Sequence, residues 1–339
     1  MSSMASKNSQ PPWFPLEWSK QSRPLLKPSP KHFVSRNIYE PSVLFDGKTH
    51  VMMFRGESSH EAPTECVGRL GIGFSPNGRD FQCQGEPVLV PDSPYESHGL
   101  AHPRLALAGG VFLLTYAAYD GKKYRLCLAT SPNLRTWFRH GPIFPEFKVE
   151  AGKPICGVIM PQARSDGKYL MYVGAQDLYL ATSTDLIDWE MQPKPVLKRA
   201  KCGDFAKKSI SPGPSPFLTK DGIVLILNGT DMKNHVRVFA ALFEPENPEK
   251  SQAQLKKPFL EAEHDWERFG YLPNVVRATG ISLINETLHL YYSGGDRCVG
   301  MATAPVPAGF LPSLAKEEKE EKAEKESKSK EPKQKVCGV

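Results

Sequence analysis

The sequence lacks any long hydrophobic run, and its cysteines are few and scattered. No apolar stretch approaches the roughly 18 residues that a membrane-spanning helix needs, so we expect no transmembrane segment and no membrane partner. The amino terminus, MSSMASKNSQPPWFPLEW, is polar and broken by proline, unlike the apolar core of a secretory signal. The 7 cysteines are odd in number and lack metal-ligand spacing. We therefore predict a reduced protein of the cytoplasm or another intracellular compartment, with no metal site.

The positive charge of the chain is small and diffuse. There are 43 Lys and Arg residues against 37 Asp and Glu residues, and in the expected folded part no basic block alternates with aromatic residues. This is not the pattern of a nucleic-acid-binding protein, so we expect no nucleic acid as a partner. The sequence also contains no Walker loop, dinucleotide fingerprint or zinc motif, and we therefore expect no cofactor.

Charged residues concentrate only at the carboxyl terminus. Residues 313–339 form a Lys/Glu-rich tail in which the two signs nearly cancel and no apolar stripe appears. A segment of this composition cannot bury a core, so the tail is predicted to be disordered or helical.

An internal repeat is present across most of the remaining chain. Its 31 prolines and 27 glycines are spread out, which suits many short strands joined by turns. Five segments share one order of features: a polar mouth marked by Pro or Gly, an apolar strand, a tight turn, a second apolar strand and an acidic residue. These segments are residues 38–57, 100–120, 158–177, 211–231 and 275–296.

A third predicted strand follows each hairpin. These strands are residues 69–75, 124–131, 178–183, 237–243 and 298–304. After three of them come the segments SPNGRDF, SPNLRTW and STDLIDW, each a candidate for a turn and a short fourth strand. Four strands recurring about every 60 residues are typical of a propeller blade.

The repeat therefore predicts an all-β fold, a five-bladed β-propeller over residues 33–312. Residues 1–32 form an N-terminal extension that we expect to be partly disordered and a candidate for closing the ring. In a propeller the innermost strands run beside the central axis, and their entry ends open onto one rim of the channel. Polar residues at these mouths are predicted to converge: Glu40, His102, Arg104, Gln162, Ser211 and Arg277. Turn chemistry explains the Pro and Gly residues there, but it does not explain this convergence.

Residues 99–137 read GLAHPRLALAGGVFLLTYAAYDGKKYRLCLATSPNLRTW. This stretch resembles the signature region of the inverting β-mannoside phosphorylases and hydrolases of glycoside hydrolase family 130. It is also similar to the trypanosomatid β-1,2-mannosyltransferases and phosphorylases that share their fold. The resemblance extends over nearly all five blades, since GKYLMYVGAQDLYLATSTDLIDWE and LHLYYSGGDRCVGMATAPV follow in the expected order.

The resemblance implies an active site on the propeller axis that holds a mannosyl residue. It places sugar-binding arginines at Arg55 and Arg104, a sugar-contacting carboxylate at Asp296, and phosphate-binding cations at Arg125 and Lys153. We predict His102 and Asp296 as catalytic residues and Arg125 and Lys153 as phosphate-binding residues. The predicted substrate-binding residues are Glu40, Arg55, Arg104, Asp120, Ser211 and Arg277.

The sequence departs from the family pattern at several places, among them Ser211-Pro212-Gly213-Pro214-Ser215, where the hydrolase-like members have EPGPP. The aspartate of the family's Glu-Asp-Pro-Arg motif, its general acid, is replaced by His102, and an asparagine of blade one is replaced by Glu40. Inverting cleavage needs a proton donor for the leaving oxygen and a nucleophile on the opposite face. Phosphate is itself the nucleophile in a phosphorylase, and histidine can donate a proton near neutral pH.

Three functions remain open from the sequence. The first is inverting glycosyl transfer on β-mannosides, by phosphorolysis or mannosyl transfer, with β-1,2-mannan-like oligosaccharides favoured. Its partners would be an oligosaccharide and inorganic phosphate or a sugar-phosphate donor. The second is a carbohydrate-binding propeller whose catalysis is impaired because the family's aspartate is absent. The third is another five-bladed glycosidase, which would need two or three carboxylates at the strand mouths, where only Glu40 clearly qualifies.

Overall fold

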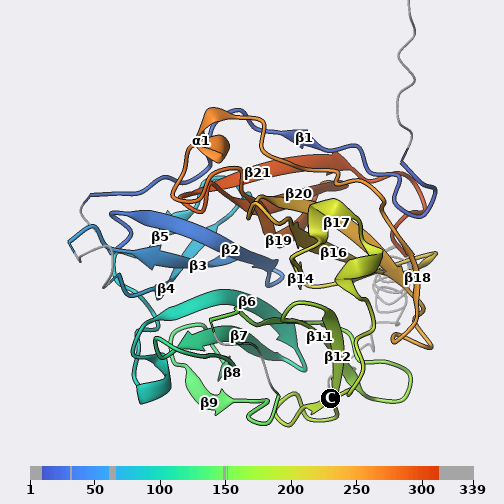
Figure 1. Ribbon diagram of the computed structural model, residues 1–339, viewed down its shortest axis with the longest axis horizontal. Helices are drawn as coiled ribbons and strands as arrows, with labels where there is room; N and C mark the ends of the chain where they lie inside the picture. The colour runs from blue at the N-terminus through green and yellow to red at the C-terminus, as the bar shows by residue number, and fades with distance from the viewer. Residues whose placement is uncertain (1–9, 31–32, 61–65, 148–149, 151, 313–339) are drawn as a thin grey trace, which may run out of the picture.

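Five antiparallel sheets stand around a common axis in chain order (Figure 1). This architecture, given by a computed structural model that describes residues 10–30, 33–60, 66–147, 150 and 152–312, is the predicted all-β five-bladed propeller. The predicted charged tail, residues 313–339, lies outside the described residues. No helix in the described part of the chain has the length and apolar character needed to cross a membrane.

Blades one to four are sheets of consecutive strands with the first strand nearest the axis. Blade one contains β2 (Asn37–Phe45), β3 (His50–Glu57), β4 (Arg69–Ser75) and β5 (Gln82–Cys83). Blade two contains β6 (Leu100–Ala108), β7 (Val111–Tyr119), β8 (Tyr124–Ser131) and β9 (Phe138–Pro142). Blade three contains β10 (Cys156–Ile159), β11 (Tyr169–Gly174), β12 (Leu178–Ser183) and β13 (Glu190–Met191). Blade four contains β14 (Ser209–Pro212), β16 (Gly222–Thr230), β17 (Val236–Phe243) and β18 (Ser251–Gln254), with β15 (Phe217–Thr219) also paired to β16.

Blade five joins the two ends of the propeller. It contains β19 (Val276–Ile284), β20 (Thr287–Gly294), β21 (Cys298–Pro305) and, at its outer edge, β1 (Ser19–Lys20). Because β1 comes from the start of the described chain and β21 from its end, their antiparallel pairing ties the ring together. The short helices are η2 (Pro94–Glu96), η3 (Arg199–Lys201), η4 (Asp204–Ala206) and α1 (Asp265–Arg268).

The third strands of blades one to three begin and end at the predicted residues, as β4, β8 and β12. The segments that follow them form turns, and the fourth strands β5, β9 and β13 start at the end of these segments or after them. In blade two the hydroxyl of Ser131 accepts a hydrogen bond from the amide of Leu134, and Oδ1 of Asn133 accepts from the amide of Thr136. Such side-chain bonds to nearby amides give the chain a turn in place of a longer strand.

The core lies between the blades. One cluster joins Val51 and Ile72 of blade one to Leu105 and Leu114 of blade two, and all four side chains are at most 2% exposed. Comparable clusters connect the other neighbouring blades. Burial of these facing apolar surfaces favours the ring, because each sheet alone would leave two apolar faces in water.

Polar contacts join the innermost strands near the axis. The amide of Leu105 in β6 donates to Oγ of Ser42 in β2 at 2.8 Å, and Oγ1 of Thr279 in β19 donates to the carbonyl of Pro41 at 2.7 Å. The fully buried amide of Asn228 in β16 makes two hydrogen bonds to the backbone of Ala278. These bonds set the positions of the strand mouths relative to one another.

Candidate active site on the propeller axis

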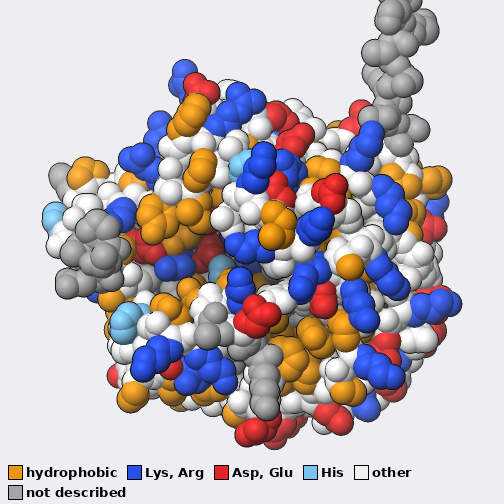
Figure 2. Space-filling model, viewed as in Figure 1, with side chains coloured by type: hydrophobic (Ala, Val, Ile, Leu, Met, Phe, Trp, Pro, Cys, Tyr) orange, Lys and Arg blue, Asp and Glu red, His pale blue; other side chains and the backbone are white. Residues whose placement is uncertain are grey.

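A cavity of about 380 Å³ opens at the strand mouths. The face seen in Figure 2 is hollowed near its centre, where acidic, basic and histidine side chains gather. The cavity is lined from blades two to five by His102, Arg104, Lys153, Cys156, Gln176, Lys208, Ser211, Asn234, Leu272 and Arg277, among others. Four of the predicted mouth residues, which are His102, Arg104, Ser211 and Arg277, therefore share one space, as does the predicted phosphate ligand Lys153.

Glu40 and His102 form the closest ionic contact in this region. Nδ1 of His102 lies 2.5 Å from Oε1 of Glu40, and Oε2 of Glu40 accepts the backbone N–H of His102 at 2.8 Å. Glu40 is 1% exposed, so its carboxylate is buried beneath His102. Burial alone would raise the pKa of Glu40, but the charges of His102, Arg55 and Arg277 together hold it well below its usual range. Glu40 is therefore an ionised acceptor and His102 donates from Nδ1.

Arg55 continues this network on the other side of Glu40. Its Nη2 lies 2.6 Å from Oε1 of Glu57, and its Nη1 lies 4.0 Å from Oε2 of Glu40. The guanidinium also stands over the ring of Tyr39, 5.1 Å from the ring centroid. The predicted residues Glu40 and Arg55 thus contact each other.

Asp296 and Arg277 form a second pair from blade five. Nη2 of Arg277 lies 3.5 Å from Oδ2 of Asp296. Burial raises the pKa of Asp296, Arg277 opposes that rise, and the charge of Glu40 adds to it. The net direction is upward, so the protonated form of Asp296 is favoured more than in an exposed aspartate.

Three buried polar atoms of this network have no hydrogen-bond partner among the described residues. They are Nε of Arg55, Nε of Arg277 and Oδ1 of Asp296. Folded proteins leave few buried polar groups unsatisfied, and a catalytic role, a water or an ion is among the explanations for those that remain. Two donors and one acceptor near the axis fit a hydroxyl-rich molecule.

The backbone is strained at the same place. Glu40, His102 and Asp296 have φ values of 55°, 52° and 44°, in the left-handed region that non-glycine residues rarely adopt. The strands bulge at Glu40 and His102, where the register shifts between Tyr39 and Ser42 and between Ala101 and Arg104. Strain of about 1–3 kcal/mol per residue persists where surrounding contacts enforce it, and it clusters at functional sites.

Cationic side chains line the side of the cavity formed by blades three to five. Sequence reasoning found Lys153 and Arg277 but missed Lys208, which lines the same cavity and donates a hydrogen bond to Oδ1 of Asn234. Lys208 immediately precedes β14, at the mouth of blade four. This position in the sequence could have predicted that Lys208 lines the cavity. Several positive charges around one cavity attract an anion.

All three guanidinium nitrogens of Arg104 donate hydrogen bonds to backbone carbonyls. Its Nε donates to the carbonyl of Gly213 at 2.7 Å, its Nη2 to that of Pro212 at 3.1 Å and its Nη1 to that of Pro103 at 2.9 Å. Burial lowers the pKa of this guanidinium. These bonds tie blade two to blade four beside the cavity, and the predicted contact of Arg104 with substrate stays a prediction.

Asp120 and Arg125 pair with each other away from the shared lining. Nη1 of Arg125 lies 2.6 Å from Oδ2 of Asp120, whose Oδ1 accepts the amides of Lys122 and Lys123. The amide of Lys123 is the largest cause that lowers the pKa of Asp120. Arg125 lines a separate cavity of about 90 Å³ beside Phe147. Their assigned roles in substrate and phosphate binding therefore stay predictions.

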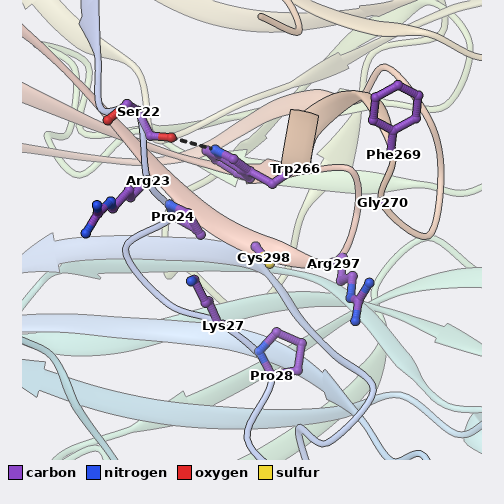
Figure 3. Close-up of a pocket in the computed structure, with 10 residues that line it drawn as sticks. All are labelled: Ser22, Arg23, Pro24, Lys27, Pro28, Trp266, Phe269, Gly270, Arg297 and Cys298. Carbon is purple, nitrogen blue, oxygen red and sulfur yellow. Dashed lines mark hydrogen bonds between the residues drawn. The ribbon is translucent and has the colours of Figure 1, made fainter. Parts of the chain in front are cut away.

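A third cavity, which the sequence did not indicate, lies beside blade five (Figure 3). It measures about 580 Å³, and Arg23, Lys27, Arg297, Trp266 and Phe269 are among its lining residues. Nε1 of Trp266 donates to the carbonyl of Ser22 at 3.0 Å, which holds the indole against the N-terminal segment (Figure 3). The phenyl ring of Phe269 remains 76% exposed.

Comparison with known proteins identifies relatives over most of the chain. The model of glycoside hydrolase family 130, described as β-1,4-mannooligosaccharide phosphorylase, matches residues 14–308. A 1,2-β-oligomannan phosphorylase from Thermoanaerobacter sp. (strain X514) is 31% identical over 287 residues, covering 83% of this chain and 94% of the relative.

Solved structures agree with these relatives. A glycosyl hydrolase from Bacteroides ovatus superposes with a TM-score of 0.76 at 26% identity, covering 88% of this chain and 96% of that one. A structure from work on family members that hydrolyse β-1,2-mannosidic linkages in Candida mannan reaches a TM-score of 0.79 at 26% identity, covering 91% and 99% of the two chains.

Proposed function

Since the chain belongs to glycoside hydrolase family 130, we propose that it is an inverting phosphorylase that cleaves β-1,2-linked mannooligosaccharides with inorganic phosphate. The observation that carries this function is the shared cavity, in which Lys153, Lys208 and Arg277 face one space with His102. An anion and a proton-transfer group are both needed for phosphorolysis, and this cavity offers binding charges for one and a candidate for the other.

The β-1,2 linkage is favoured over the β-1,4 linkage. The family description names β-1,4-mannooligosaccharides, whereas the 31% identical relative is a phosphorylase of 1,2-β-oligomannan. We give more weight to the relative, because a direct alignment over 83% of this chain is more specific than a description of the whole family.

The mannosyl residue is assigned to the paired side chains near the axis. Oδ1 of Asp296 and the Nε atoms of Arg55 and Arg277 are buried and have no hydrogen-bond partner among the described residues, and of these three residues only Arg277 lines the cavity. Sugar hydroxyls both donate and accept hydrogen bonds, so they can satisfy all three atoms. Ser211, at the mouth of blade four, lines the same cavity and adds a hydroxyl.

Phosphate is assigned to Lys153 and Lys208, with Arg277 between phosphate and sugar. One phosphate oxygen attacks the anomeric carbon while the bond from that carbon to the leaving oxygen breaks. The leaving oxygen must then take up a proton, and His102 and Asp296 are the two predicted catalytic residues that could supply it. Positive side chains bind the phosphate dianion and hold it in position to attack the anomeric carbon.

A carbohydrate-binding propeller without turnover is the second candidate. The observation that favours it is the histidine at position 102, where the resemblance implies an aspartate as general acid. Binding would use the same arginines and Asp296, so the two candidates differ only in turnover.

The test incubates the purified protein with β-1,2-mannobiose, with and without phosphate, and follows the products by NMR. We expect α-mannose 1-phosphate, formed only when phosphate is present, and slower reaction with β-1,4-mannobiose. Release of free mannose without phosphate would assign hydrolysis instead. If neither disaccharide gave products but calorimetry still detected binding, the second candidate, a carbohydrate-binding propeller without turnover, would be favoured.

A further inference from the structure

We propose that Glu40 and His102 act as one proton-transfer unit, in which the imidazole protonates the leaving oxygen and Glu40 is the positioning residue that holds it. This inference rests on the proposed phosphorolysis and deepens it. It also changes the assignment of Glu40, which the sequence predicted to be substrate-binding.

Glu40 is too enclosed to serve a ligand directly. One carboxylate oxygen is occupied by Nδ1 of His102 and the other by the His102 backbone N–H. Its own amide donates to Oγ of Ser293 in blade five at 2.8 Å. With 1% exposure, Glu40 is buried between blades, and His102 is the cavity-lining residue with which its carboxylate is in direct contact.

The histidine ring, by contrast, reaches the cavity. His102 lines the cavity beside Lys153 and Arg277, and its side chain is 12% exposed. Because Nδ1 is engaged by Glu40, the nitrogen left for a ligand is Nε2, which makes no hydrogen bond to a described residue. A carboxylate that accepts from one imidazole nitrogen fixes the ring's orientation and supports its cationic form.

The charges around the ring make Glu40 necessary. Arg55 from β3, Arg277 from β19, Arg104 from β6, and Lys153 and Lys208 from the cavity wall are all positive. The other nearby acids are already paired, since Asp296 lies beside Arg277 and Glu57 lies 2.6 Å from Arg55. A protonated imidazole in such surroundings would be repelled without a carboxylate in direct contact.

The proton balance of the step closes within the reactants. Nε2–H of His102 passes its proton to the leaving oxygen as the glycosidic bond breaks and its electron pair moves to that oxygen. An oxygen of HPO₄²⁻ forms the new bond to the anomeric carbon. The mannosyl phosphate produced carries the proton that was on the phosphate, and release of that proton returns the imidazole to its cationic form.

The decisive experiment compares two substrates that differ in their need for an acid. His102→Asn should reduce kcat on β-1,2-mannobiose by about 10²- to 10⁴-fold, the usual contribution of general acid catalysis. It should leave phosphorolysis of 2,4-dinitrophenyl β-mannoside within a few-fold of wild type, because dinitrophenolate leaves without protonation. Equal losses on both substrates would mean that His102 only supports the structure, and the proposal would be wrong. His140→Asn, in the outer strand β9 of the same blade, is the matched control and should leave both rates unchanged.

Glu40→Gln tests the positioning role. Loss of the carboxylate removes the contact that holds Nδ1 and orients the ring, so kcat should fall on β-1,2-mannobiose and stay within a few-fold of wild type on 2,4-dinitrophenyl β-mannoside. An unchanged kcat on β-1,2-mannobiose would overturn the role of Glu40.

A measurement without turnover separates this proposal from the proposed function. Long-range ¹H–¹⁵N NMR of the wild-type protein should show a proton held on Nδ1 of His102, and Glu40→Gln should change that signal. If the mannosides give no product but the signal behaves this way, the proposed function fails and the pair stands. If mannosides react but Nδ1 carries no proton, the pair fails alone.

Discussion

Nδ1 of His102 lies 2.5 Å from Oε1 of Glu40, and the two residues belong to the innermost strands of neighbouring blades. Each has a left-handed backbone, with φ of 52° and 55°, and each precedes a proline, Pro103 or Pro41. The bulges at these positions turn the two side chains toward each other. One contact between blades one and two therefore joins the packing of neighbouring blades to the proposed chemistry.

Lys208→Ala is expected to weaken phosphate binding selectively. Removal of one charge-assisted contact should raise the KM for phosphate roughly 10- to 100-fold and leave the KM for mannobiose within about twofold. Initial rates measured against phosphate concentration at fixed salt give the result. Lys207→Ala removes an exposed lysine next in sequence and serves as the control. A matching rise in the KM for mannobiose would place Lys208 elsewhere in the reaction.

Asp296→Asn is expected to separate activity from stability. The variant should lose about 10²-fold or more in kcat/KM, since it removes a carboxylate at the developing charge. Burial raises the pKa of Asp296 in the folded protein above the ordinary value of 3.8 that it has in the unfolded chain. At pH values above 3.8 the ionised carboxylate therefore destabilises the folded state relative to the unfolded state.

The Asp296→Asn protein should therefore have a melting temperature at pH 7 that is equal to or higher than that of wild type. Any increase in melting temperature should disappear below about pH 3.8. Calorimetric melting at both pH values measures it. The exposed Asp188→Asn is the control. A lower melting temperature at pH 7 would show that the ion pair with Arg277 outweighs the cost of burial.

Glu267→Gln is expected to loosen the closure of blade five. Glu267 is fully buried and accepts hydrogen bonds from Nζ of Lys20 in β1 at 2.7 Å and from the hydroxyl of Tyr292 at 2.8 Å. The variant leaves the charge of Lys20 unpaired, which should cost about 3–5 kcal/mol in the free energy of unfolding. Urea denaturation measures the change, with Glu263→Gln as the exposed control.

The pH dependence of this contribution follows from the direction of the pKa shift. Burial would raise the pKa of Glu267, but the amide of His264 and the ammonium of Lys20 outweigh burial and lower it. Its stabilising effect is therefore complete above the ordinary value of 4.5 and is lost as the pH falls through the lowered pKa. If the difference in the free energy of unfolding between Glu267→Gln and wild type grew as the pH fell, this account would be contradicted.

Asn228→Ala is expected to destabilise the strand mouths. The Asn228 amide pairs with both the N–H and the carbonyl of Ala278, so the variant leaves two backbone groups of β19 unpaired. Each should cost about 1–3 kcal/mol. The free energy of unfolding and the KM for mannobiose should both worsen, because β19 also carries Arg277. A stable variant with a normal KM would show that another group satisfies Ala278.

Much of this architecture was predictable because blade patterns are local. Alternation of apolar residues, Asp-Gly and Gly-Gly turns and the repeat length identified five hairpins, and three of the third strands have the predicted ends. The short fourth strands were placed less well, since the preceding Ser-x-Asn and Ser-x-Asp segments satisfy their own amides in turns.

The sequence alone determined the family pattern and the list of polar residues at the strand mouths, because each mouth is encoded by its own few residues. Only the tertiary structure decided which of them meet. Glu40 contacts His102, Arg104 bonds to backbone carbonyls, Asp120 and Arg125 pair with each other, and Lys208 joins the cavity. These outcomes depend on bulges and on the angle between blades, which distant residues set through packing and which no local spacing encodes.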